Sequence, residues 1–244
     1  MRRELKTLKD LEAVSRAAAT VIEEAIEEEA RRRAPFSLVL PGGSTPRRLF
    51  ELLGTDWRDR LPWDRIHVFW TDERFVAPSH ADSNYGLAKR LFLDRVPIPP
   101  EHVHRVPTER TDLQSAATAY DEEIRSYFAD AGREGFDVVL LGVGADGHTA
   151  SLFPGAPATP DAWAVPVIGP AYRPPRERVT LTYRALSVSR TVLFLVSGTE
   201  KKDALTRTFD GPDEDIPAGR ILGTDRTLFL VDAAASPETN AGGR

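Results

Sequence analysis

The 244-residue chain contains no cysteine, which excludes disulfide bonds, thiolate catalysis and cysteine-ligated metal sites. It also lacks any run of about 18 apolar residues, the length that a membrane-spanning helix needs. The first ten residues include no apolar stretch suited to a signal peptide, so we expect a cytoplasmic protein without a membrane partner. Basic residues are not in excess either. The 32 Lys and Arg are scattered among 37 Asp and Glu, which indicates no nucleic-acid partner.

Hydrophobic residues make up 41% of the chain and recur along its whole length, enough for one sizeable core. Nearly continuous apolar runs predict strands buried on both faces, at Phe36–Leu40, Ile66–Trp70, Phe136–Leu141, Val192–Val196 and Leu228–Val231. Amphipathic patterns predict helices at Leu11–Arg33, Arg47–Leu53, Tyr85–Asp94, Ser115–Asp130 and Lys201–Phe209. This alternation predicts a single α/β domain with three layers, Rossmann-like, around an open, mostly parallel sheet. We expect it to cover residues 1–233, with a disordered tail at 234–244.

The loops that follow the strands are the candidate binding segments, because ligands of such folds bind beyond the carboxyl ends of the strands. The first loop contains Gly42, Gly43, Ser44 and Thr45 directly before a helix. Its glycines allow a ligand to approach the backbone, and Ser44 or Thr45 can cap the helix. Free amides at the helix start favour an anion such as phosphate, although an ordinary strand-to-helix turn has the same composition.

A second loop, Thr71–Arg74, combines two adjacent carboxylates with an arginine. The segment Ser79–Asn84 follows it, shortly before a helix that Asp82 or Ser83 can cap. Carboxylates beside an arginine can orient sugar hydroxyls and a charged group. The same residues also fit a surface ion pair and an ordinary helix cap.

The third loop, Gly142–Gly155, begins with the glycines Gly142, Gly144 and Gly147. Asp146 and His148 stand on either side of the last of these glycines. Histidine titrates near neutral pH, so His148 is the natural acceptor of a proton from water. The glycine spacing also matches the G-x-G-x-x-G of dinucleotide-binding loops. No acidic residue closes a following strand about 20 residues further on, so we do not expect a dinucleotide.

Taken together, these segments resemble the successive motifs of the 6-phosphogluconolactonase family, in the same order and over most of the chain. The matching stretches are LPGGSTP, TDER, HADSNY, GVGADGHTASLFPG and SGTEK. The resemblance implies a sugar-phosphate domain that hydrolyses 6-phospho-D-glucono-1,5-lactone to 6-phospho-D-gluconate in the pentose phosphate pathway. It implies no metal and no organic cofactor, and a small sugar phosphate as the binding partner.

The resemblance also implies roles for individual residues. His148 would activate the attacking water, while Asp146 and Asp72 are the two candidates to support it. The residues expected to bind the substrate are Gly42, Gly43, Ser44, Thr45, Arg74, Asn84, Gly144, Arg178 and Lys201. Arg178 and Lys201 match basic positions of the later motifs, although each by itself also fits a solvated surface charge.

Two other functions stay open. The glucosamine-6-phosphate deaminases are similar in fold and share the phosphate loop and the Gly-Asp-Gly-His segment. They place a carboxylate where this chain has Phe153, so the departure favours a lactonase over an isomerising deaminase. A non-catalytic sugar-phosphate-binding regulator would need a DNA-binding segment, and none is evident before Phe36.

The remaining histidines and the tryptophans are interpreted as structural residues. His102 and His104 form a His-x-His pair, but no third ligand lies at a suitable spacing, so we expect no metal site. His67 belongs to a predicted buried strand. The core or the wall of a pocket is the expected place of Trp57, Trp63, Trp70 and Trp163.

Overall fold

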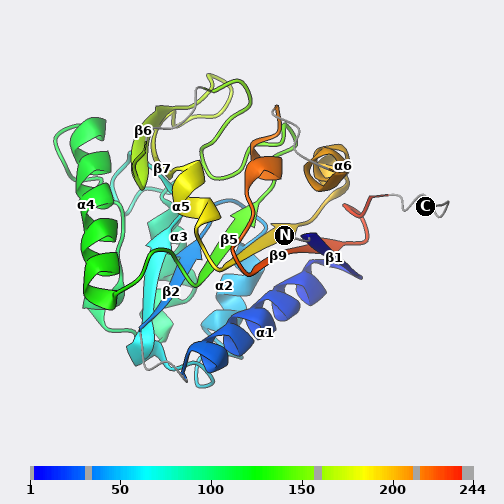
Figure 1. Cartoon of the computed structure of the whole chain (residues 1–244), viewed down its shortest axis with the longest axis horizontal. Coiled ribbons are helices and arrows are strands. Elements are labelled where there is room, and N and C mark those ends of the chain that lie inside the picture. Colours follow the sequence, from blue (N-terminus) through cyan, green and yellow to red (C-terminus); the bar gives the residue numbers. More distant parts are fainter. Residues whose placement is uncertain (1–2, 31–34, 157–160, 211–214, 238–244) are drawn as a thin grey trace.

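A parallel sheet of six strands forms the centre of the molecule, in the order β1-β9-β8-β5-β2-β3 (Figure 1). The computed structural model describes residues 3–30, 35–156, 161–210 and 215–237. In the order of the sheet, the strands are β1 (Arg3–Leu8), β9 (Arg226–Asp232), β8 (Thr191–Val196), β5 (Val138–Gly142), β2 (Phe36–Leu40) and β3 (Ile66–Trp70). Because all neighbouring strands are parallel, their carboxyl ends and the loops that follow lie at one edge.

Helices cover both faces of this sheet and complete three layers (Figure 1). One face packs against α1 (Leu11–Ala30), α2 (Arg47–Leu53) and α3 (Asn84–Leu91), the other against α4 (Leu113–Ala131), α5 (Tyr183–Ser187) and α6 (Lys202–Asp210). Successive residues of β2 alternate between the two cores: Leu38 and Leu40 contact the first helical layer, and Val39 contacts the second. Both faces are therefore apolar, as the continuous hydrophobic runs predict.

Short helical turns connect several of these elements. They are 3-10 helices at Trp63–Arg65, Leu93–Arg95, Pro100–His102, Thr199–Lys201 and Pro217–Arg220. The longest helix of the second layer, α4, begins at a capping box of Asp112 and Ser115 and ends at Gly132 in the left-handed conformation.

A second, antiparallel sheet of three strands was not predicted from the sequence. Its strands, in the order β4-β7-β6, are β4 (Asp72–Arg74), β7 (Glu177–Leu181) and β6 (Ala164–Ile168). The segment Thr71–Arg74, expected as a loop, therefore contains a strand. It pairs Asp72 with Thr180 and Arg74 with Arg178, which brings two distant parts of the chain together.

The predicted α/β class, the three layers, the single domain and the mostly parallel main sheet are confirmed. The first predicted helix was extended to Arg33, whereas α1 ends at Ala30 and residues 31–34 lie outside the described chain. Of the expected tail, residues 234–237 are described and include the buried Ala235. Residues 238–244 lie outside the described part, so the domain limit and the disordered tail stay predictions.

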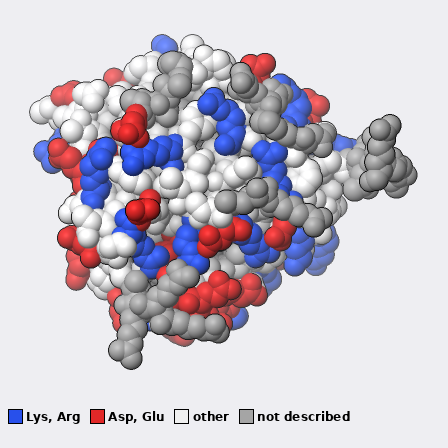
Figure 2. Space-filling model, in the orientation of Figure 1, with Lys and Arg blue, Asp and Glu red and all other residues white. Residues whose placement is uncertain are grey.

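The surface carries charges of both signs. On the face shown in Figure 2, Lys and Arg side chains lie among Asp and Glu side chains. No helix in the described ranges is long and apolar enough to cross a membrane.

Candidate active site

A polar pocket of about 260 Å³ lies at the carboxyl ends of β2, β3, β5 and β8. Every predicted site residue except Asp146 and Asn84 lines it: Gly42, Gly43, Ser44, Thr45, Asp72, Arg74, Gly144, His148, Arg178 and Lys201. A larger cavity of about 780 Å³ lies between α4 and β6. Its wall is mostly apolar and contains none of the predicted site residues, so the polar pocket is the candidate active site.

His148 and Asp146 form a pair in the loop after β5. His148 Nδ1 lies 2.5 Å from Asp146 Oδ1, and the His148 backbone amide donates to the same oxygen at 3.3 Å. Because a carboxylate accepts a hydrogen bond here, Nδ1 carries the proton and Nε2 has the free lone pair. Asp146 therefore contacts His148 through Nδ1, the ring nitrogen that does not accept the proton from water. It need not line the pocket itself.

Gly144 makes this close pair possible. A Cβ at this position would lie 1.9 Å from His148 Nδ1 and 2.6 Å from Asp146 Oδ1, far inside any normal contact. The Gly144 amide also donates to the His148 carbonyl oxygen at 2.8 Å, which closes the loop on itself. The loop after β5 thus needs glycine at position 144 for packing against the histidine.

The surroundings of the pair favour a neutral histidine beside an ionised carboxylate. Burial lowers the pKa of His148, although the hydrogen bond to Asp146 opposes part of this effect. Burial acts to raise the pKa of Asp146, but the hydrogen bond and charge of His148, together with Arg173, lower it on balance. At neutral pH, Nε2 can therefore accept a proton.

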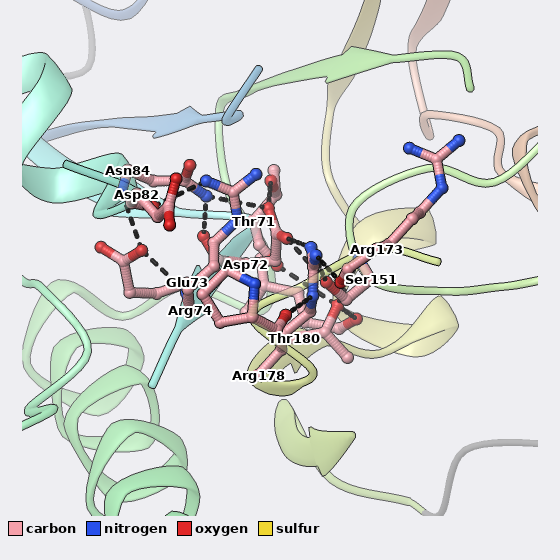
Figure 3. Close-up of polar contacts among 12 residues, drawn as sticks. Thr71, Asp72, Glu73, Arg74, Asp82, Asn84, Ser151, Arg173, Arg178 and Thr180 are labelled. Carbon is pink, nitrogen blue, oxygen red and sulfur yellow. Dashed lines mark hydrogen bonds and ion pairs between the residues drawn. The ribbon is translucent and has the colours of Figure 1, made fainter. Parts of the chain in front are cut away.

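Asp72 belongs to a different network. Its Oδ2 accepts from Ser151 Oγ at 2.7 Å and lies 3.8 Å from Arg178 Nη1, and its Oδ1 lies 3.3 Å from Asn84 Nδ2 (Figure 3). Both carboxylate oxygens are thus engaged by neighbouring side chains. Among the two candidates to support His148, Asp146 makes the contact and Asp72 instead holds Arg178.

Asn84 lies behind the first loop and not at the pocket surface. Its side chain is buried, donates to the Asp72 carbonyl oxygen at 2.8 Å, and would lie 2.2 Å from a Cβ on Gly42. Glu73 points away from Asp72 toward the start of α3, where it accepts from the Asn84 amide (Figure 3). It also accepts from Ser83 Oγ and from the Tyr85 amide. Asn84 therefore fixes the loop and the strand that line the pocket, and its assignment to substrate binding stays a prediction.

Three arginines from two strands and one loop bring positive charge to the pocket. Arg74 and Arg178 are directly opposite each other in the antiparallel sheet, and Arg173 lies in the loop before β7. The Nε atoms of Arg74 and Arg173 are buried and have no hydrogen-bond partner within the described residues. Since all three arginines line the pocket, it is suited to an anionic ligand.

Sequence reasoning missed Arg173. The segment Pro170–Pro175 was interpreted as a plain loop, because neither flanking strand, β6 nor β7, was predicted. The available signal was a basic residue beside prolines and close to Arg178. This pattern alone is too common to indicate a site.

The first loop lines the pocket without the expected helix cap. The N-cap position of α2 is Pro46, which has no side chain to accept a hydrogen bond, so neither Ser44 nor Thr45 caps this helix. Their side chains instead belong to the pocket wall. At α3, the cap is Ser83, whose Oγ accepts from the Gly86 amide, and not Asp82.

Three other histidines, His67, His102 and His104, cluster at the amino end of β3, away from the pocket. His67 Nδ1 lies 2.8 Å from His104 Nε2, and His67 stacks on His102 with ring centroids 3.9 Å apart. Burial, with the charges of the other two histidines, lowers the pKa of His67 to about 4. Across the described ranges, no group of three or more His, Asp or Glu side chains is arranged to hold a metal ion. The four tryptophans are buried, as predicted for core residues.

Comparison with known proteins gives matches over nearly the whole chain. Residues 9–230 match the family model described as glucosamine-6-phosphate isomerases/6-phosphogluconolactonase. Among curated proteins, the 6-phosphogluconolactonase of Nostoc sp. is 37% identical over 242 residues, which cover 98% of this chain and 99% of that relative.

Solved structures extend the comparison to the fold. The crystal structure of 6-phosphogluconolactonase from Thermotoga maritima superposes with a TM-score of 0.83 at 32% identity, covering 95% of this chain and 100% of the other. A monomeric glucosamine-6-phosphate deaminase superposes with a TM-score of 0.79 at 23% identity, covering 95% and 98%. Since the fold is shared by both kinds of enzyme, the side chains in the pocket have to distinguish the reactions.

Proposed function

The chain belongs to the glucosamine-6-phosphate isomerase/6-phosphogluconolactonase family, and from this premise we propose that it is a lactonase of the pentose phosphate pathway. It hydrolyses 6-phospho-D-glucono-1,5-lactone to 6-phospho-D-gluconate. The observation that carries the proposal is the His148–Asp146 pair, whose free ring nitrogen belongs to a pocket that arginines also line. Its cytoplasmic location and the lack of nucleic-acid and membrane partners stay predictions from the sequence.

In the proposed mechanism, His148 Nε2 takes a proton from water as the water oxygen attacks the lactone carbonyl carbon. Asp146 keeps the Nδ1 proton in place and stabilises the imidazolium that forms. Backbone amides of the glycine loops stabilise the oxyanion on the former carbonyl oxygen. The bond to the ring oxygen then breaks, and His148 returns its proton to that oxygen, which becomes a hydroxyl group.

The phosphate of the substrate is bound by the basic side chains of the same pocket. A phosphate monoester carries nearly two negative charges near neutral pH, so it needs several donors. Arg74, Arg173 and Arg178 supply guanidinium groups, and Lys201 adds an ammonium group from the segment after β8. Ser44 and Thr45, with the neighbouring amides, complete the set of donors.

The deaminase alternative is tested at the position of Phe153. Its ring centroid lies 5.2 Å from that of His148, and its side chain is buried. A phenyl ring cannot exchange protons, so this chain lacks the carboxylate that the resemblance assigns to the deaminases.

We expect opening of the phosphorylated lactone and no ammonia release from glucosamine 6-phosphate when the two substrates are assayed side by side. Ammonia release without lactone opening would reverse the assignment, and neither activity would favour the non-catalytic binding protein.

Arg74→Ala should raise the apparent KM for the lactone more than it lowers kcat. The arginine lines the pocket opposite Arg178, and we propose that it binds the phosphate and not the reacting carbonyl. Steady-state kinetics measures both constants, with Arg110→Ala as a matched loss of an exposed arginine outside the pocket. A large fall in kcat at unchanged KM would contradict a role in phosphate binding.

Inorganic phosphate and 6-phosphogluconate should compete with the lactone, because the basic pocket recognises the phosphate independently of the carbonyl. Gluconate, which lacks the phosphate, should compete poorly. Inhibition constants from initial rates measure the difference. Equal inhibition by the two sugar acids would rule out the phosphate as the main anchor.

A further inference from the structure

The loop between β6 and β7 contacts the catalytic pair, with Arg173 in the wall of the pocket and Tyr172 outside it. Its base is closed by the Gly169 amide, which donates to the Arg176 carbonyl oxygen at 2.7 Å, and by Arg176 Nε, which donates to the Gly169 carbonyl oxygen at 3.0 Å. The Arg173 amide donates to the Pro170 carbonyl oxygen at 3.0 Å and forms a turn at the tip. These bonds hold Tyr172 in a defined place.

The tyrosine contacts the oxygen of Asp146 that His148 does not use. Tyr172 Oη lies 3.2 Å from Asp146 Oδ2, and Arg173 Nη2 lies 3.6 Å from the same atom, while Oδ1 accepts both bonds from His148. Because the carboxylate is planar, a donor at Oδ2 restricts its rotation and so fixes the direction in which Oδ1 faces Nδ1.

Packing does not explain this tyrosine. Its side chain is 70% exposed, so the ring contributes little to the core, and the hydroxyl makes the contact with the catalytic loop. An exposed aromatic residue whose polar end meets a carboxylate beside a general base indicates a role in the site.

We propose that Tyr172 is a positioning residue for the lactonase reaction: its hydroxyl holds Asp146, which in turn holds His148 with Nε2 toward the substrate. The inference rests on the proposed function. It adds a residue that acts on the base through a carboxylate and does not touch the substrate.

The pH dependence offers a readout that a purely structural role would not change. The charged groups around His148 are Asp146 on its own loop, Arg173 on the β6–β7 loop and Asp72 on β4. The phenol draws negative charge from Asp146, so its removal lets the carboxylate stabilise the imidazolium more strongly. The acid limb of the kcat/KM profile should then move to higher pH.

Tyr172→Phe tests the proposal, because it removes the hydroxyl and keeps the ring. We expect kcat to fall about two- to tenfold, the range that one net hydrogen bond supports, with little change in KM. Tyr172→Ala should lower kcat at least as much, since it also removes the ring that faces the Arg173 guanidinium. Ile168→Ala, which removes the exposed side chain at the end of β6, should leave kcat and the acid limb as in the wild type.

An NMR titration of the His148 imidazole in the wild type and in Tyr172→Phe separates this inference from the proposed function, because it needs no substrate. A raised imidazole pKa in the variant supports the contact even if the lactone proves to be the wrong substrate. Unchanged kcat and an unchanged imidazole titration in Tyr172→Phe would overturn the inference, as would an effect seen only in Tyr172→Ala.

Discussion

Replacing His148 with alanine should lower the turnover of the lactone by about 100-fold or more, the usual scale for a general base. Its Nδ1 is bound to Asp146, and Nε2 is the nitrogen that can take the proton from water. In the wild type, activity should fall as the solution is acidified through the pKa of His148, because the protonated ring has no free lone pair. Burial lowers this pKa, so the acid limb should lie below the ordinary histidine value of about 6.5.

The controls separate a catalytic from a structural role. The alanine variant should keep its fold, because His148 lies in a loop outside both hydrophobic cores, and circular dichroism with thermal unfolding can check this. His148→Asn asks whether hydrogen bonding alone suffices, and His102→Ala removes a histidine away from the pocket. Near-normal turnover of a folded His148→Ala would make the histidine a binding or structural residue, with Asp72 as the next candidate base.

Gly144→Ala should lower the turnover of the lactone about as much as His148→Ala does, again on the order of 100-fold. The new methyl group would overlap His148 Nδ1 and Asp146 Oδ1, so the pair could not form as it does in the wild type. Steady-state kinetics on the folded variant measures the loss.

A double variant provides the matched test of this explanation. If Gly144→Ala acts only by displacing the histidine, it should cause almost no further loss in the His148→Ala background, because both changes remove the same group. Losses that multiply in the double variant would show that Gly144 acts elsewhere in the site.

The central strands were predictable because their sequences are apolar on both faces. The runs at Phe36–Leu40 and Ile66–Trp70 match β2 and β3 at both ends. The edge strand β1 has the sequence RELKTL and is half-exposed, so its pattern does not differ from that of a polar surface segment. β4 has three polar residues and forms only by pairing with β7, about a hundred positions away, which no local pattern can indicate.

The site was predictable where chemistry depends on a loop sequence, and not where it depends on pairing between distant segments. Glycines and a histidine after β5 point to a base at His148 from the sequence alone. The linear sequence does not distinguish Asp72 from Asp146, since each follows a predicted strand and each carboxylate can accept a hydrogen bond from the histidine. Only the folded loop shows that Asp146 faces Nδ1 and that Asp72 is held by Ser151 and Arg178.

The most direct test compares the loss of freshly generated 6-phosphoglucono-1,5-lactone with increasing amounts of the wild type and of His148→Ala in the same buffer. The spontaneous rate is the intercept at zero enzyme, so the slope alone reports catalysis. We expect a steep linear slope for the wild type and a slope smaller by about 100-fold or more for the folded variant. A wild-type slope of zero would contradict the lactonase function, and equal slopes would contradict His148 as its base.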